Sequence, residues 1–132
     1  MKNIVPLLLI TMLVSAAACK EKTSDRFELL TSHAWTSDRL LANGVDASDP
    51  GEILEKFKGT ITFNEDGSGT FGQYTGTWMF VDNEANVVIQ SPDLDAALTA
   101  HIVELTKKSL KVTFVYPTLE GMKNIRMTFK PV

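Results

Sequence analysis

The sequence predicts an all-β protein: an eight-stranded antiparallel up-and-down barrel with a short helix after the first strand. Between residues 61 and 89, apolar side chains alternate with polar ones, and turn-forming residues recur at short intervals. Such a pattern is typical of a β-meander. Three further alternating segments follow Ser91. Eight is also about the number of strands at which such a sheet closes around side chains or a small ligand. A two-sheet sandwich of the same strands is the alternative.

Each strand is predicted from an alternating run bounded by turn residues. The expected strands lie at residues 35–41, around 61–63, 71, 78–80 and 87–89, and at 99–106, 110–116 and 125–130. Between the first two strands, Pro50 and the acidic Glu52 favour a helix start, so we expect one short helix over residues 50–58. A helical turn over residues 27–31, with Asp25 as its N-cap, precedes the first strand.

The amino-terminal stretch is predicted to be a targeting segment outside the fold. Residues 4–14 are an apolar run after Lys2, of signal-peptide length and too short to span a membrane. Small residues at 15–18 then precede Cys19, the only cysteine. This stretch resembles a bacterial lipoprotein signal peptide, whose lipobox ends in small residues and a cysteine. The alternatives are an ordinary secretory signal, with Cys19 left as a free thiol, and a transmembrane anchor.

The lipoprotein resemblance implies cleavage before Cys19 and a lipid such as palmitate on that residue. Residues 1–18 would be the signal peptide, 19–26 the lipidated tether and 27–132 the barrel domain. The protein would then be anchored in the bacterial cell envelope, at the outer membrane, with its face left open. Removing residues 1–18 leaves 12 basic against 16 acidic residues, a net charge of −4. This acidic balance predicts no nucleic-acid partner, and a lipidated Cys19 leaves no thiol for a disulfide.

Three features of the domain carry a second resemblance. Trp35 lies at the first strand, Gly76, Thr77 and Trp78 lie in the middle of the chain, and Arg126 comes late. With the lipid anchor, residues 27–132 resemble the lipocalin-like lipoproteins of Bacteroidetes, although His33 stands where lipocalins carry the glycine of G-x-W. The resemblance implies a barrel that holds a small molecule, with Arg126 packed on Trp35 at its closed end. A solvated Arg126 on the outer face is the alternative.

No catalytic or metal-binding constellation is predicted. The chain has two histidines, His33 and His101, which are too few for a zinc site when Cys19 is lipidated. Ser68 lies in a hairpin turn and not in a nucleophile elbow, and the acidic turn around it lacks the final glutamate of a calcium loop. Asp93 and Asp95 are interpreted as loop residues. We therefore expect no enzyme activity, no cofactor and no metal.

The candidate ligand site lies inside the barrel. If residues 107–108 form a hairpin turn, His101, Val103 and Leu105 share the inward face of their strand, and His101 lies near an open end. The candidate ligand-binding residues are Phe63, Trp78, Phe80, His101, Phe114 and Tyr116. Together with Phe71 and Phe129, these rings either line a cavity or fill it.

Two functions remain open from the sequence. The first is an envelope-tethered lipoprotein that binds a small apolar or amphipathic molecule in its barrel. The second is a non-enzymatic interaction protein with a filled barrel that contacts another envelope protein. The second requires an exposed apolar patch, which we expect around Leu40, Leu41, Leu94 and Leu98.

Overall fold

The computed structural model describes residues 23–132. The predicted signal peptide, Cys19 with its predicted lipid, and the first part of the predicted tether lie outside the described residues. No helix in the described range is long and apolar enough to cross a bilayer.

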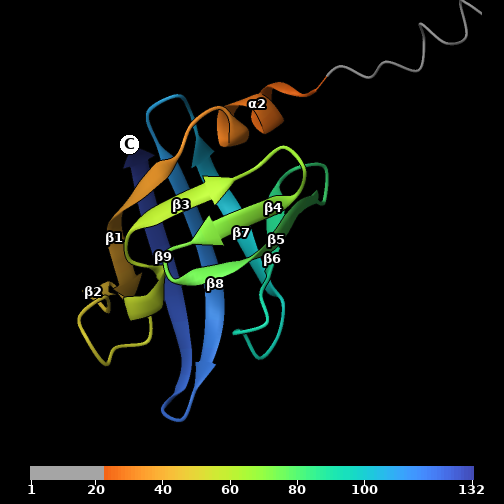
Figure 1. Cartoon of the computed structure of the whole chain (residues 1–132). Helices are drawn as coiled ribbons and strands as arrows, with labels where there is room; N and C mark the ends of the chain where they lie inside the picture. The colour runs from red at the N-terminus through yellow and green to blue at the C-terminus, as the bar shows by residue number, and fades with distance from the viewer. Residues whose placement is uncertain (1–22) are drawn as a thin grey trace, which may run out of the picture.

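An antiparallel sheet closes on itself to form the body of the protein (Figure 1). Its strands are β1 (Trp35–Ala42), β2 (Val45–Asp46), β3 (Thr60–Phe63), β4 (Ser68–Phe71), β5 (Tyr74–Val81), β6 (Asn86–Gln90), β7 (Leu98–Leu105), β8 (Leu110–Thr118) and β9 (Gly121–Pro131). From β3 to β9 each strand pairs with the next in sequence, and β1 pairs with both β3 and β9. The two-residue β2 adds only to the edge of β1. The remaining eight strands form an up-and-down barrel, so the predicted fold class is confirmed.

Two helical segments flank β1. Helix α2 (Asp25–Thr31) precedes it, and the 3₁₀-helix η1 (Glu55–Phe57) follows it. The hydroxyl of Ser24 accepts a hydrogen bond from the backbone N–H of Phe27 at 3.0 Å, so Ser24 and not Asp25 is the N-cap. The helix expected over residues 50–58 shortens to η1. Near its expected start, Gly51 adopts φ = 87°, a left-handed conformation that a right-handed helix cannot include.

Bulges in two strands change the inward and outward alternation. In β1 the pairing with β9 shifts between Ser37 and Arg39, and in β7 the pairing with β8 shifts between Ile102 and Glu104. The extra residue of a bulge exchanges the two faces for every residue beyond it. As a result, Leu40 points into the barrel in β1. In β7, Val103 still points outward after Ile102, and Leu105 beyond the bulge points inward.

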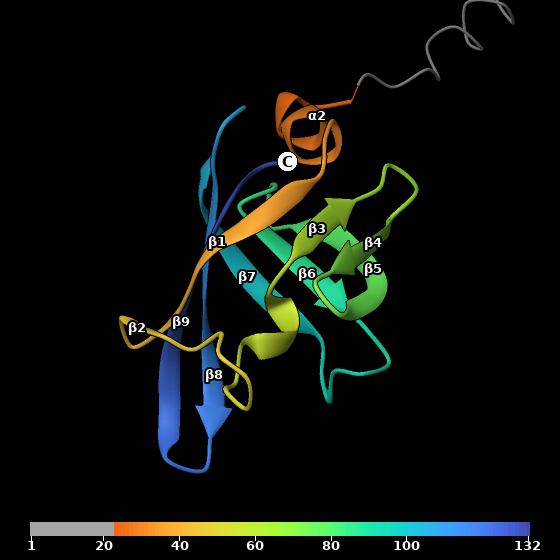
Figure 2. The same ribbon diagram turned by 60° about the vertical axis from the view of Figure 1, so that its left-hand side comes forward.

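Among the described residues, the buried core runs from Leu30 to Phe129, with Phe27 and Leu29 packed against it. Leu30 of α2 is completely buried, and Leu54 and Phe57, in and beside η1, are almost so. Figures 1 and 2 show α2 lying across the end of the barrel that also carries the C-terminus. Within residues 23–132, the closed sheet and α2 together enclose this core.

Candidate functional site

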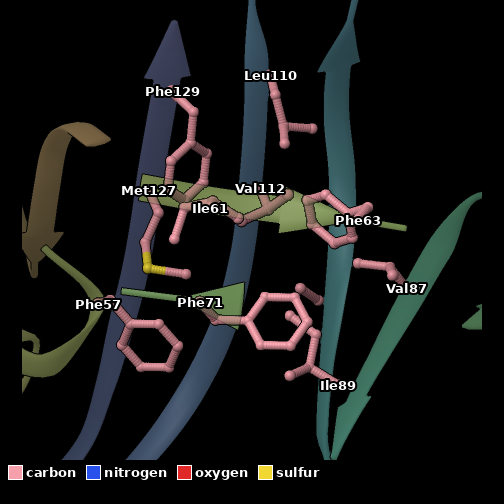
Figure 3. A pocket seen from close by; sticks show the side chains of 11 residues that line it. Phe57, Ile61, Phe63, Phe71, Val87, Ile89, Leu110, Val112, Met127 and Phe129 are labelled. Atoms are coloured by element: carbon pink, nitrogen blue, oxygen red, sulfur yellow. The ribbon is translucent and has the colours of Figure 1, made fainter. Parts of the chain in front are cut away.

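The barrel interior holds a cavity of only about 20 Å³ (Figure 3). Only apolar side chains line it: Phe57, Ile61, Phe63, Phe71, Val87, Ile89, Ala100, Leu110, Val112, Met127 and Phe129. That volume is about the room needed for one water molecule, whereas sites for small ligands usually measure about 300–1,000 Å³. The eight-stranded architecture is one that ligand-binding barrels share, but side chains fill this interior.

The predicted inward orientation of Phe63, Trp78 and Phe80 is confirmed, and their rings pack on one another. The Phe63 and Trp78 rings lie edge to face with centroids 5.5 Å apart, and Phe80 meets Trp78 in the same way at 5.3 Å. The Trp78 indole N–H donates to the carbonyl oxygen of Asn64 at 2.9 Å. Because the faces and edges of these rings contact one another, the rings form part of the packed core.

Phe114 and Tyr116 also take the inward phase predicted for them. Phe114 is buried opposite Ile125 of β9, and Tyr116 is half-buried against the core. Both lie on β8 toward the end of the barrel opposite α2. Neither residue lines the interior cavity.

The expectation that His101 points inward is wrong. His101 is exposed on the outer face of β7 and pairs with Thr113, because Ala100 and Ile102 take the inward positions before the bulge at Val103. Its Nδ1 lies 2.9 Å from the side-chain oxygen of Asn86, whose amide donates to the Asp82 carboxylate at 2.6 Å. The six predicted ligand residues therefore do not form one site: five pack inside, and His101 lies outside.

Arg126 does not pack on Trp35. Trp35 is completely buried, with its indole N–H donating to the carbonyl oxygen of Leu30 at 3.1 Å and the His33 ring against its own at 4.4 Å. Arg126 lies on the outer face of β9, opposite Leu41 and Thr113. The alternative interpretation, an arginine on the outer face, is confirmed.

The predicted turn forms at residues 64–67, and Ser68 directly after it begins β4. The Asp66 carboxylate accepts hydrogen bonds from the backbone N–H and the hydroxyl of Ser68 at 2.9 and 2.7 Å. These bonds lower the pKa of Asp66. Within residues 23–132, no three His, Cys, Asp or Glu side chains come close enough to hold a metal ion together.

The exposed apolar patch predicted around Leu40, Leu41, Leu94 and Leu98 is absent. Leu40 and Leu98 are buried, and Leu94 packs against the core. Only Leu41 lies on the outer face, half-buried beside Arg126. The bulge in β1 turns Leu40 inward, and the pairing of Leu98 with buried Ile89 aims it into the barrel.

Exposed apolar side chains gather instead at the end of the molecule opposite α2. There the β8–β9 hairpin extends beyond the other strands, beside the β1–β2 turn (Figures 1 and 2). Five of the eight large apolar side chains exposed in the described range lie here; we call them the distal surface: Val45, Ile53, Val115, Leu119 and Met122. Leu119, in the hairpin turn, is 109% exposed, and Met122 is 65% exposed.

A hollow of about 260 Å³ lies within this end of the molecule, between the β1–β2 region and the hairpin. Val45 and Ile53 contribute apolar atoms to its lining, and Thr118, Glu120 and Lys123 contribute polar ones. The exposed Glu120 carboxylate lies 3.9 Å from the half-buried Lys123 ammonium, forming an ion pair. Apolar side chains beside a polar-rimmed hollow are suited to receiving side chains of a partner protein.

Sequence reasoning overlooked this surface because residues 117–122 fall between the predicted strands at 110–116 and 125–130. The available signal was Leu119 at the tip of a turn, where polar or small residues are usual.

Comparison with models of known protein families finds none that matches this chain, and comparison with curated proteins finds no match either.

Proposed function

We propose that this protein is a non-enzymatic cell-envelope lipoprotein that contacts another envelope protein through the distal surface. The observation that carries this proposal is the filled barrel: a cavity of about 20 Å³ leaves recognition to the exterior. The exterior feature that stands out is the exposed apolar group around Leu119 on a projecting hairpin. Clustered exposed apolar side chains are typical of protein interaction sites.

The predicted lipid anchor on Cys19 also favours a protein partner at the distal surface. The described chain begins at the end of the molecule that carries α2, and the distal surface lies at the other end (Figure 1). A lipid on Cys19 would therefore hold the α2 end near the membrane and leave the distal surface available to a partner.

The experiment is partner capture in the bacterial host by chemical crosslinking, comparing the native chain with the double variant Leu119→Ser/Met122→Ser. We expect the variant to lose most of one crosslinked species, because it removes two exposed apolar side chains and no core contact. Met79→Ser/Val103→Ser is the matched control, since Met79 and Val103 are also exposed and lie outside the distal surface. Equal capture by all three chains would contradict the proposal.

Mass spectrometry of the same preparation tests two further parts of the proposal, the lipid on Cys19 and the absence of a bound small molecule. Cys19 should carry the lipid at the N-terminus of the mature chain, and the barrel should carry no small molecule. A stoichiometric apolar ligand that survives purification would favour the ligand-binding function instead, because the filled interior would then have to open.

A further inference from the structure

The outer faces of β1, β8 and β9, with the turn before β8, carry a group of cations that we call the basic face: Arg39, Lys108, Lys111, Arg126 and Lys130. Residues 23–132 contain ten lysines and arginines and fifteen aspartates and glutamates. Half of these cations belong to the basic face, but only two carboxylates, Asp38 and Glu104, lie among them. An acidic domain thus presents one positively charged side.

The strand register places these cations in neighbouring rows around Thr128. Arg39 and Lys111 flank Thr128 on the two adjacent strands, while Arg126 and Lys130 lie two residues away along β9 in opposite directions. Adjacent strands lie about 4.8 Å apart, and residues two apart along a strand lie about 7 Å apart. A hollow of about 440 Å³ lies among these side chains. Several oxyanions could therefore be contacted at once.

Ion pairs within the domain neutralise only two of the five cations of the basic face. Asp38 lies 3.4 Å from Lys130, and Glu104 lies 3.4 Å from Lys111. Within residues 23–132, Arg39, Lys108 and Arg126 form no ion pair with any carboxylate. Guanidinium groups without internal partners are well suited to binding phosphate.

The basic face begins at the end of the molecule where the tether enters. The turn that holds Lys108, the last residues of β9 with Lys130, and α2 all lie at that end (Figures 1 and 2). Five residue steps separate Cys19 from Ser24, and they span at most about 18 Å even when fully extended. If Cys19 is lipidated, as the proposed function requires, this end of the domain stays close to the lipid headgroups.

We propose that the basic face binds the phosphate groups of an anionic lipid bilayer and so orients the tethered domain on the membrane. Lys108 and Lys130 lie nearest the tether and make the first contacts. The acidic remainder of the domain is repelled by the same surface and turns away from it.

The test uses unlipidated residues 20–132, which lack only the predicted signal peptide and Cys19, in a sedimentation assay with vesicles. We expect binding to vesicles of phosphatidylcholine with phosphatidylglycerol, weakening with added salt, and none to phosphatidylcholine alone. Arg39→Gln/Arg126→Gln should weaken binding about 25-fold, since each cation near an anionic surface contributes about fivefold. Both arginines are exposed, and neither forms an ion pair within the described residues. The substitutions should therefore leave the thermal melt unchanged, and this melt confirms that the variant is folded.

The matched control is Lys56→Gln/Lys58→Gln, which removes the same charge within and just after η1, outside the basic face. It should bind as the native chain does; an equal loss in both variants would show that only net charge matters and would overturn the proposal. Failure to bind the anionic vesicles would also overturn it. Vesicle binding that is undiminished in excess inorganic phosphate and salt would overturn it as well. Tight binding of polyglutamate without vesicle binding would also overturn it and would identify an acidic protein as the partner. Because this chain lacks the lipid and needs no protein partner, these failures would leave the proposed function standing.

Discussion

Substitution of Phe71 by alanine tests whether the barrel is filled. Phe71 is 1% exposed, points inward from β4 and lies edge to face with Phe63 at 5.5 Å. Its ring also lies over Gly69, where an added Cβ would come within 2.7 Å of it. Removing a ring from such packing costs about 3–5 kcal/mol, of which the aromatic pair accounts for about 0.5–1.5 kcal/mol. Domains of this size have a total stability of about 5–15 kcal/mol, so the loss is a large fraction.

Equilibrium unfolding in urea, followed by tryptophan fluorescence, measures this loss. We expect a lower midpoint with an unchanged slope, because the variant loses stability without changing the surface exposed on unfolding. Met79→Ala, on the exposed face of neighbouring β5, is the control and should change the free energy of unfolding by less than about 0.5 kcal/mol. A loss below about 1 kcal/mol for Phe71→Ala would mean that the ring borders empty space, and the filled interior would be refuted.

A second measurement on the same variant uses benzene as a probe. The truncation leaves an apolar void beside the existing cavity, and such voids bind benzene. Benzene should therefore raise the melting temperature of Phe71→Ala through binding to the native state, and it should leave the native chain unchanged. Stabilisation of the native chain by benzene would show that the barrel already holds ligand-sized space.

Three further predictions concern local features. Gly76→Ala should lower the free energy of unfolding by about 1–3 kcal/mol in urea titrations, because its Cβ would overlap the backbone carbonyl of Gln90 on β6. Burial, with smaller contributions from Tyr116, Asp93 and Asp95, raises the pKa of Tyr74. The stability that its neutral phenol contributes is therefore complete below the ordinary pKa of about 10 and is lost as the pH rises through the folded-state pKa; Tyr74→Phe should flatten this alkaline loss in urea midpoints measured against pH. The pKa of Asp66 is lowered by the Ser68 hydrogen bonds, so its contribution is present above the ordinary pKa of about 3.9 and is lost as the pH falls through the folded-state value. Ser68→Ala should reduce that acid-side loss in the same titration.

The alternation of side chains was enough to predict the barrel. Each predicted strand appears near its expected position, and sequential hairpins leave few ways to pair them. Closure followed from the number of strands, since it buries the apolar faces together and removes the sheet edges. Only the two-residue β2, which has no alternation to detect, was missed.

The bulges explain why the candidate site was predicted less well. Across residues 100–105, Ala100 and Ile102 carry one phase, and Val103 and Leu105 carry the other. Strict alternation backward from Leu105 placed His101 inside, but the extra residue at Val103 separates the two phases. Adjacent apolar residues inside an otherwise alternating strand were the only trace of the bulge. Whether the rings lined or filled the interior depended on how they pack against Leu54, Phe57 and α2, and no strand pattern contains that information.

The two proposed surfaces, the distal surface and the basic face, adjoin on the outer face of the β8–β9 hairpin. Val115 and Met122 of the distal surface share the outward phase of Lys111 and Arg126. A domain lying flat on a bilayer would press all four residues against it, whereas a short tether at the α2 end favours a tilt in which the basic face touches phosphate and Val115 and Met122 do not. The variant Leu119→Ser/Met122→Ser decides between these orientations when it is added to the vesicle assay. Unchanged vesicle binding is expected for the tilted domain. A loss as large as that of the arginine pair would mean that the hairpin inserts into lipid, and the distal surface would then belong to the membrane and not to a protein partner.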